Sequence, residues 1–220
     1  MKPTLTIENL IAAAKIFCET MAKKNHRDLI GITDGKAVGT YVEHEFQKYL
    51  CEQYTLTVGN SARGIDLPDE HITTDIKVTS ATQPQSSCPF ESSRQKIFGL
   101  GYNLLIFVYD KRDSADKCTL QFVHCAFVEK HRTGDFTTTK RLREMIDDGA
   151  NTEDIVGFLR DKNLPGDEIT LNRLAEEILS NMPPQGYLTI SNALQWRLQY
   201  SRAISLSNSV AGVTNYDWQA

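Results

Sequence analysis

The sequence predicts an α/β fold in which a central β-sheet is covered by helices and followed by a helical C-terminal region. Strand-like runs are concentrated between residues 54 and 128, and amphipathic helical patterns lie on both sides of them. The chain has 220 residues, of which 40% are hydrophobic, so it can build one sizeable core and is neither disordered nor fibrous. We expect a core over residues 1–135 and a smaller helical region over 136–220 that packs on it.

Properties of the whole chain narrow the class further. The apolar stretch Leu10–Phe17 follows Glu8 and contains Lys15, so we expect neither a signal peptide nor a membrane span, and a cytoplasmic protein. The five cysteines form no C-x-x-C pair, which favours reduced thiols over disulfides. One group of thiols and imidazoles invites a zinc interpretation: Cys118, His124, Cys125 and His131. Their spacing matches no common zinc site, so we expect none there.

Charge is segregated along the chain. The net charge of −4 argues against indiscriminate binding to polyanions. The stretch Lys130–Arg143, however, contains five basic residues and one acid. The stretch Gln185–Tyr216 contains two arginines and no acid. The first of these stretches is expected to contact DNA phosphates without sequence preference, through Lys140, Arg141 and Arg143.

The first half of the chain predicts two helices and then several strands. Apolar residues at helical spacing predict helices over Thr6–Lys24 and Lys36–Gln53. Three strand-like runs follow, over Tyr54–Val58, Arg63–Leu67 and His71–Thr79. The turn composition of Pro68-Asp69-Glu70 predicts that the last two runs form a hairpin.

The middle of the chain predicts the centre of the sheet. Ser80–Pro89 has loop composition, and Glu91–Phe98 reads as a short helix that ends at a glycine pair. Tyr102–Tyr109 is the most strongly apolar segment, which predicts a buried central strand, and Thr119–Val128 continues the sheet.

The C-terminal region is predicted to be helical. The expected helices are Thr138–Asp148, Thr152–Arg160, Thr170–Asn181 and Thr189 to about Ile204. The last two imitate a helix-turn-helix, whose second helix either packs on the core or enters the DNA major groove. In the second case it presents Asn192, Gln195, Arg197, Gln199 and Arg202 to the bases.

The predicted hairpin carries the residues of greatest chemical interest. It brings Asp66 close to Asp75, and Asp75 and Lys77 project from the same face of one strand. Two carboxylates, the carbonyl of Ile76 and waters would suit Mg²⁺, and Lys77 would lie beside an attacking water. This arrangement suits phosphodiester hydrolysis. The alternative is a solvated surface hairpin on which Lys77 pairs with one of the aspartates.

These residues resemble the PD-(D/E)XK nuclease superfamily, which has the restriction-endonuclease-like fold. The matching residues are Ile65-Asp66, Asp75-Ile76-Lys77 and Gly39-x-x-x-Glu43, with Ile65 in the proline position. The resemblance covers about residues 36–109 and implies a mixed central sheet flanked by helices. It also implies that Asp66 and Asp75 bind the metal and that Glu43 assists. Helical periodicity does not decide between Glu43 and Glu45, but Glu43 fits the family's spacing.

The resemblance also implies contacts to DNA from the segment after the D-x-K strand. In similar nucleases a polar residue on the next helix helps to hold the water or the DNA, and Gln95 is the candidate here. Arg94 and Lys96 could contact phosphates, and the preceding loop offers Gln83 and Gln85 to the DNA. A soluble helix face and a plain connector are the alternatives.

Together these features predict a Mg²⁺-dependent endonuclease that resembles type II restriction enzymes and cuts double-stranded DNA at a specific sequence. No phosphate-binding G-x-x-x-x-G-K-[ST] motif is present, so we expect no nucleotide cofactor. Cutting both strands of a palindrome calls for two sites related by a twofold axis, and we therefore expect a homodimer. The alternatives are a structure-specific repair or recombination nuclease and a noncatalytic DNA-binding protein.

Overall fold

The computed structural model describes residues 2–59, 64–88, 91–191, 197–206 and 208–219. Its centre is a four-stranded sheet in the order β1-β3-β4-β7. The strands are β1 (Thr74–Ser80), β3 (Asn103–Asp113), β4 (Cys118–Val128) and β7 (Val213–Asp217). Strands β1 and β3 run parallel and the other neighbours run antiparallel, so the predicted mixed sheet flanked by helices is confirmed.

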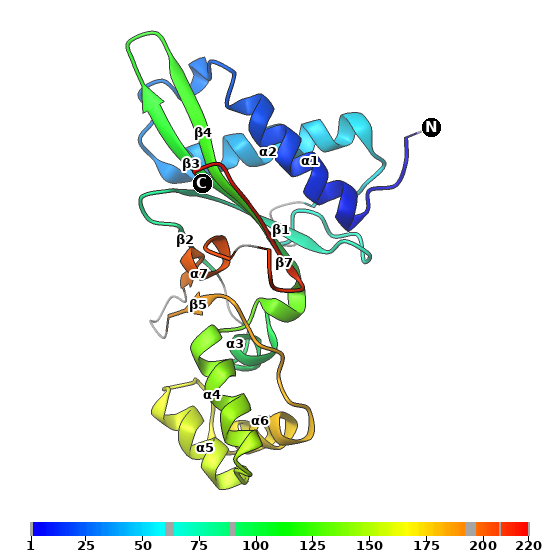
Figure 1. Ribbon diagram of the computed structural model, residues 1–220, viewed down its shortest axis with the longest axis vertical. Coiled ribbons are helices and arrows are strands. Elements are labelled where there is room, and N and C mark those ends of the chain that lie inside the picture. The colour runs from blue at the N-terminus through cyan, green and yellow to red at the C-terminus, as the bar shows by residue number, and fades with distance from the viewer. Residues whose placement is uncertain (1, 60–63, 89–90, 192–196, 207, 220) are drawn as a thin grey trace.

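Two long helices cover one face of this sheet, α1 (Ile7–Met21) and α2 (Gly35–Gln53) (Figure 1). The side chain of Thr6 caps α1 and that of Asp34 caps α2, by accepting hydrogen bonds from free N–H groups of the first turn. Phe17 and Phe46 pack against Phe107 of β3 at ring-centre distances of 5.8 and 5.0 Å. Both predicted N-terminal helices are therefore confirmed, and they fix the position of β1.

The opposite face is covered by C-terminal segments. A second, three-stranded sheet has the order β2-β6-β5, formed by β2 (Gln85–Ser87), β6 (Arg197–Gln199) and β5 (Thr189–Ile190). The short helix α7 (Ser201–Ile204) follows β6. Tyr200 and Leu198 are fully buried and pack with Ile106 of the central sheet.

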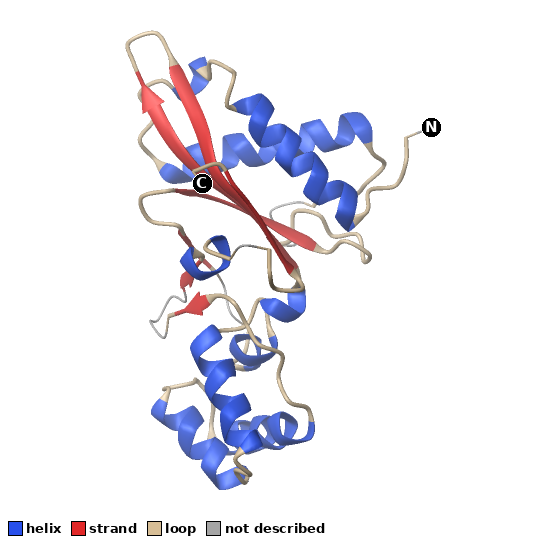
Figure 2. Ribbon diagram, viewed as in Figure 1, coloured by secondary structure: helices blue, strands red, loops and turns tan. Residues whose placement is uncertain are grey.

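The remaining helices form a cluster with its own apolar core at one end of the molecule (Figure 2). They are α3 (Arg94–Phe98), α4 (Phe136–Asp147), α5 (Thr152–Asp161) and α6 (Glu168–Ser180). Short 3-10 helices occur at Arg27–Leu29 and Lys130–Arg132. No helix in the described part of the chain is both long and apolar enough to span a membrane.

The predicted helix over Thr189–Ile204 is wrong, and with it the helix-turn-helix. The described part of this segment forms β5, β6 and the single turn α7. In β6, Leu198 is buried between the exposed Arg197 and Gln199, which is the two-residue period of a strand. The tail also contributes β7 to the central sheet. The division of the chain near residue 135 stays a prediction.

The predicted hairpin is confirmed at its central pair. Leu67 and Thr74 form an antiparallel bridge, while the rest of Arg63–Leu67 that the structure describes is irregular. The predicted strand Tyr54–Val58 is likewise reduced to one bridge, at Thr55. The loop predicted over residues 80–89 contains β2, and residues 89–90 lie outside the described part.

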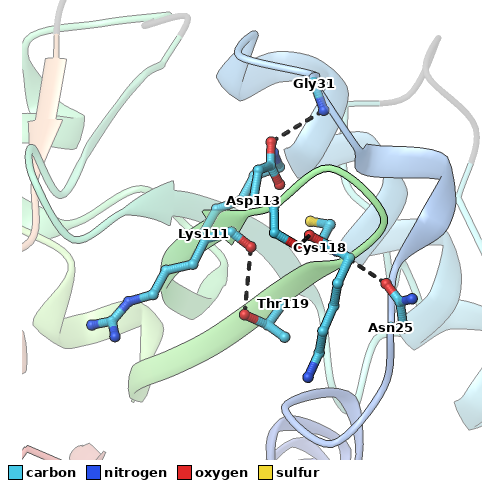
Figure 3. Close-up of polar contacts among 9 residues, drawn as sticks. Asn25, Gly31, Lys111, Asp113, Cys118 and Thr119 are labelled. Atoms are coloured by element: carbon cyan, nitrogen blue, oxygen red, sulfur yellow. Dashed lines mark hydrogen bonds and ion pairs between the residues drawn. The ribbon is translucent and has the colours of Figure 1, made fainter.

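Figure 3 shows how the far end of the β3–β4 hairpin is held by the segment that joins α1 to α2. The N–H of Cys118 donates to Oδ1 of Asn25 at 3.0 Å, and the N–H of Gly31 donates to Oδ2 of Asp113 at 3.1 Å. Lys111 pairs with the same carboxylate at 2.5 Å. All five cysteines are free, as predicted. These contacts hold the tip of the β3–β4 hairpin against the segment between α1 and α2.

Candidate active site

The predicted acids and lysine gather around one cavity at the outer edge of β1. The cavity measures about 300 Å³ and lies between α2, β1 and the segment before the hairpin turn. Strand β1 is at the edge of the central sheet, so this side of it is open to a substrate. The polar side chains that line the cavity are Glu43, Gln47, Asp66, Asp75 and Lys77.

Asp66 is oriented by the backbone of the neighbouring strand. The reciprocal bonds between Leu67 and Thr74 place Asp66 opposite Asp75. Oδ2 of Asp66 then accepts the N–H of Ile76 at 2.6 Å. Backbone groups alternate along a strand, and those of Thr74 point to Leu67, so the carbonyl of Ile76 points to the same open edge. The arrangement is consistent with the metal-ligand set that the resemblance implies.

Asp75 and Lys77 form a closely paired couple on one face of β1. Nζ of Lys77 lies 2.7 Å from Oδ2 of Asp75, and their side chains are 20% and 6% exposed. Ile76 points the other way and is buried under α1 and α2. The side-chain directions predicted from the alternation are therefore correct.

Packing of α2 on the sheet selects Glu43 over Glu45. Gly39 lies against Val78 of β1, which brings the next turn of α2, with Glu43, to the cavity. The side chain of Gln47 donates to Glu43 at 3.4 Å. Glu45 instead lines a separate hollow between α1 and α2, beside Lys24 and Lys48.

The cavity carries more negative than positive groups. Burial raises the pKa of Glu43 to about 7, and the carboxylates of Asp66 and Asp75 add to this effect. Burial also raises the pKa of Asp75 to about 7, against the opposing charge of Lys77. Burial acts to lower the pKa of Lys77, but the charge and hydrogen bond of Asp75 outweigh it and the pKa is raised. Three carboxyl groups thus share one ammonium, an arrangement that favours binding of a proton or a cation.

The donor set fits a hard divalent ion. Carboxylate oxygens with a backbone carbonyl are ligands that Mg²⁺ accepts, and Mg²⁺ takes only one or two protein carboxylates because it keeps several waters. Among the residues that the structure describes, no three histidine, cysteine or acidic side chains form a complete metal cluster.

A group of hydroxyl and thiol side chains lies near Lys77. The sequence did not predict this group. Sγ of Cys88 lies 3.4 Å from the hydroxyl of Tyr102, and the hydroxyl of Tyr200 hydrogen-bonds to Ser86. Burial raises the pKa of both tyrosines, so both stay neutral. Their spacing in the sequence carries no signal, because three separate segments bring them together.

Several residues predicted to bind DNA lie on the three-stranded sheet or beside it. Arg197 and Gln199 are exposed on β6, Gln85 is half-buried on β2, and Gln83 is exposed in the preceding turn. The guanidinium of Arg202 stacks 3.8 Å above the ring centre of Phe136. Asn192 and Gln195 lie outside the described residues.

The other residues predicted to bind DNA already have partners within the chain. Arg94 forms an ion pair with Glu177 at 2.7 Å, and the amide oxygen of Gln95 accepts the N–H of Glu91 at 3.0 Å. Lys96 is buried, and burial lowers its pKa. In α4 the remaining basic residues contact Glu144 or the carbonyl of Pro183; they are Lys140, Arg141 and Arg143.

Comparison with known proteins gives a single family. The family model described as "Type II restriction enzyme NspV" matches residues 4–215. A curated protein of the same name from Nostoc sp. (strain ATCC 29411 / PCC 7524) is 52% identical over 211 residues, which is 95% of this chain and 95% of that protein. No solved structure matches the chain.

Proposed function

Because the chain belongs to the NspV family of type II restriction enzymes, it is a site-specific deoxyribonuclease, and we propose that the β1 cavity is its Mg²⁺-dependent active site. The four charged residues of the site are Glu43, Asp66, Asp75 and Lys77. The substrate is double-stranded DNA. The observation that carries the proposal is the convergence of three carboxyl groups and one half-buried lysine on a single open cavity.

In this proposal the two aspartates and the outward carbonyl of Ile76 hold the metal. Asp66 is fixed by its hydrogen bond to the Ile76 N–H and Asp75 by its contact with Lys77, so both face the cavity before any ligand arrives. When bound, Mg²⁺ supplies a hydroxide-like nucleophile and neutralises the charge that grows on the phosphate. Glu43 contributes a third carboxylate, either directly or through a bound water.

Lys77 serves the attacking water and the transition state. Its ammonium lies next to the aspartates that hold the metal, so it donates to a water there or to a non-bridging phosphate oxygen. Its pKa is raised by Asp75, and the residue is therefore a cation at neutral pH. A cation stabilises negative charge and orients water through its hydrogen bonds, and this is the role we assign to Lys77.

Plasmid cleavage tests the assignment directly. Wild-type protein should give discrete fragments with Mg²⁺ and none with EDTA, and Asp75→Ala and Lys77→Ala should give none with either. Glu45→Gln is the matched control, because Glu45 lies on the same helix but lines a different hollow. Equal cutting by the folded Asp75→Ala or Lys77→Ala protein would overturn the proposal.

The same experiment separates the alternative functions. Preferential cutting of branched or damaged DNA without sequence preference would support a structure-specific nuclease. Tight, salt-sensitive DNA binding without cleavage under any condition would support a noncatalytic protein.

We also propose that the enzyme acts as a homodimer, because one cavity cuts one strand and a palindromic site presents two equivalent strands. Sedimentation with and without a duplex that contains the site tests this expectation. A purely monomeric complex that cuts both strands at once would contradict it.

A further inference from the structure

The three-stranded sheet lies on the side of the central sheet opposite α1 and α2 (Figure 1), and its outer face carries polar residues. On β6, Arg197 and Gln199 are exposed, while the intervening Leu198 is fully buried. Gln85 pairs opposite Gln199, and Ser87 opposite Arg197, so these side chains share that face. The inner face, with Leu198 and Ile190, packs on the central sheet.

The dimensions of this face suit the major groove. Gln85, Arg197 and Gln199 all lie on the neighbouring strands β2 and β6, whose axes are about 4.8 Å apart. The major groove of B-DNA is about 12 Å wide and admits a two-stranded β-ribbon such as this pair. Each strand has only two or three residues, so the face is short enough to follow the floor of the groove.

The chemistry of the face suits base edges. A glutamine amide pairs with the donor and acceptor of adenine, and an arginine guanidinium pairs with the two acceptors of guanine. No acid occurs between Gln185 and Tyr216 that would repel phosphates. In the part of the chain that the structure describes, neither Arg197 nor Gln199 donates a side-chain hydrogen bond, whereas Arg94 and Arg143 already have acceptors.

The face is rigidly connected to the strand that carries Asp75 and Lys77. The N–H of Gln85 donates to Oγ1 of Thr79 at 3.1 Å, and Thr79 lies two residues after Lys77 on β1. From the other side, the N–H of Tyr200 donates to the carbonyl of Pro84 at 2.9 Å. Bases held on this face therefore have a fixed position relative to the phosphates at the cavity.

We propose that the outer face of the β2-β6-β5 sheet enters the DNA major groove, and that Gln85, Arg197 and Gln199 read base edges there and determine the sequence that is cut. This inference rests on the proposed nuclease function. It replaces the predicted recognition helix with a recognition sheet.

The test compares Gln85→Ala, Arg197→Ala and Gln199→Ala with Arg160→Ala, an exposed arginine on α5 that pairs with Glu168. The site is first defined by sequencing the ends of fragments made by the wild-type enzyme. Each sheet variant should cut a duplex with this site about 10- to 100-fold more slowly, the loss expected for one base-reading contact, or accept altered bases. Arg160→Ala should keep wild-type specificity.

Modified DNA gives a second readout that does not depend on protein folding. Replacing purines of the site by their 7-deaza analogues removes major-groove acceptors, and should slow wild-type cutting at the positions that the variants no longer discriminate. Replacing guanine by inosine removes the 2-amino group from the minor groove and one hydrogen bond of the base pair but leaves the major-groove edge unchanged, so it should have little effect.

Two outcomes would overturn the recognition sheet. One is unchanged rate and specificity in all three sheet variants; the other is sensitivity to inosine without sensitivity to 7-deaza purines. In both outcomes the wild-type enzyme still cuts in a Mg²⁺-dependent manner. If the wild-type protein does not cut at all, the proposed function itself fails, so the two failures are distinguishable.

Discussion

Leu67 and Thr74 exchange two backbone hydrogen bonds of 2.9 Å, and this one pair places Asp66 opposite Asp75. Without it the segment around Asp66 would be tied to β1 only through side chains. Asp66 lies on an irregular segment, and its position therefore depends on the pairing of that segment with β1. This relationship underlies the predictions that concern the site.

We expect Asp75→Asn to abolish cleavage while the protein stays folded. The substitution keeps the shape of the side chain but leaves the ammonium of Lys77 without its charged partner, so thermal stability at pH 8 should be lower while the fold persists. Cleavage should fall by at least about 100-fold, because a group that supports the developing charge is lost. Single-turnover rates and circular dichroism melting check both parts. Loss of activity together with loss of folding would leave Lys77→Ala as the deciding variant.

Stability without metal should fall as the pH rises from about 4 to about 7. Glu43 and Asp75 have raised pKa values in the folded protein, so over this range the folded state binds more protons than the unfolded state. Melting temperatures in EDTA measure the effect. Glu43→Gln should flatten the dependence, and a wild-type curve that rises over the same interval would contradict the prediction.

Mg²⁺ affinity should increase with pH and level off above about 7. The ion competes with the protons that Glu43 and Asp75 retain, so binding releases protons at pH 6 and fewer at pH 8. Calorimetry in buffers of different ionisation enthalpy measures the proton release directly. Identical affinity at both pH values would show that these two acids do not contact the ion.

Lys77→Met should separate DNA binding from cleavage. The apolar side chain leaves Asp75 without its partner, so the pKa of Asp75 should rise further and the cavity should stay close to neutral. In Ca²⁺ the variant should bind a duplex that contains the site within a few-fold of wild type, and in Mg²⁺ it should not cut. Lys111→Met is the comparison and should cut normally, because Lys111 pairs with Asp113 at the end of β3 away from the cavity.

Asn25→Ala should lower stability without changing the chemistry. It leaves the N–H of Cys118 without its acceptor at the far end of the β3–β4 hairpin (Figure 3), and the carbonyl of Asp116 loses the Asn25 amide that donates to it. Losing each such hydrogen bond costs about 1 kcal/mol, and each corresponds to roughly 2–4 °C in melting temperature for a chain of this size. The rate of cleavage per folded molecule should be unchanged. A large loss of that rate would mean that the hairpin communicates with the cavity.

Much of the fold could be predicted from the sequence because its signals are local. The long helices α1 and α2 and the buried strand β3 follow from apolar periodicity, and the class of enzyme follows from the D-x-K hairpin motif and is confirmed by the family match. The sequence predicted a helix in place of β5 and β6 because Ile190, Leu194 and Leu198 recur every four residues, which is the spacing of a helix.

The site could be predicted only in part because some of its members meet through tertiary packing. Asp66, Asp75 and Lys77 belong to one hairpin, so their proximity is a local property. Glu43 and Glu45 flank the same apolar stripe of α2, and only the packing of Gly39 on Val78 decides which of them reaches the cavity. No pattern within a short window contains that information.

The last strand has a consequence for biosynthesis. Residues 43–77 leave the ribosome early, but Leu198 and Tyr200, which pack with Ile106 of β3, follow much later, and β4 acquires its outer neighbour only with Val213–Asp217. A nascent or prematurely terminated chain therefore carries the acids of the proposed site before the sheet that supports β1 is complete. We expect a chain that lacks these last segments to be unstable and to cut no DNA, so that cleavage begins only when nearly the whole chain has been translated.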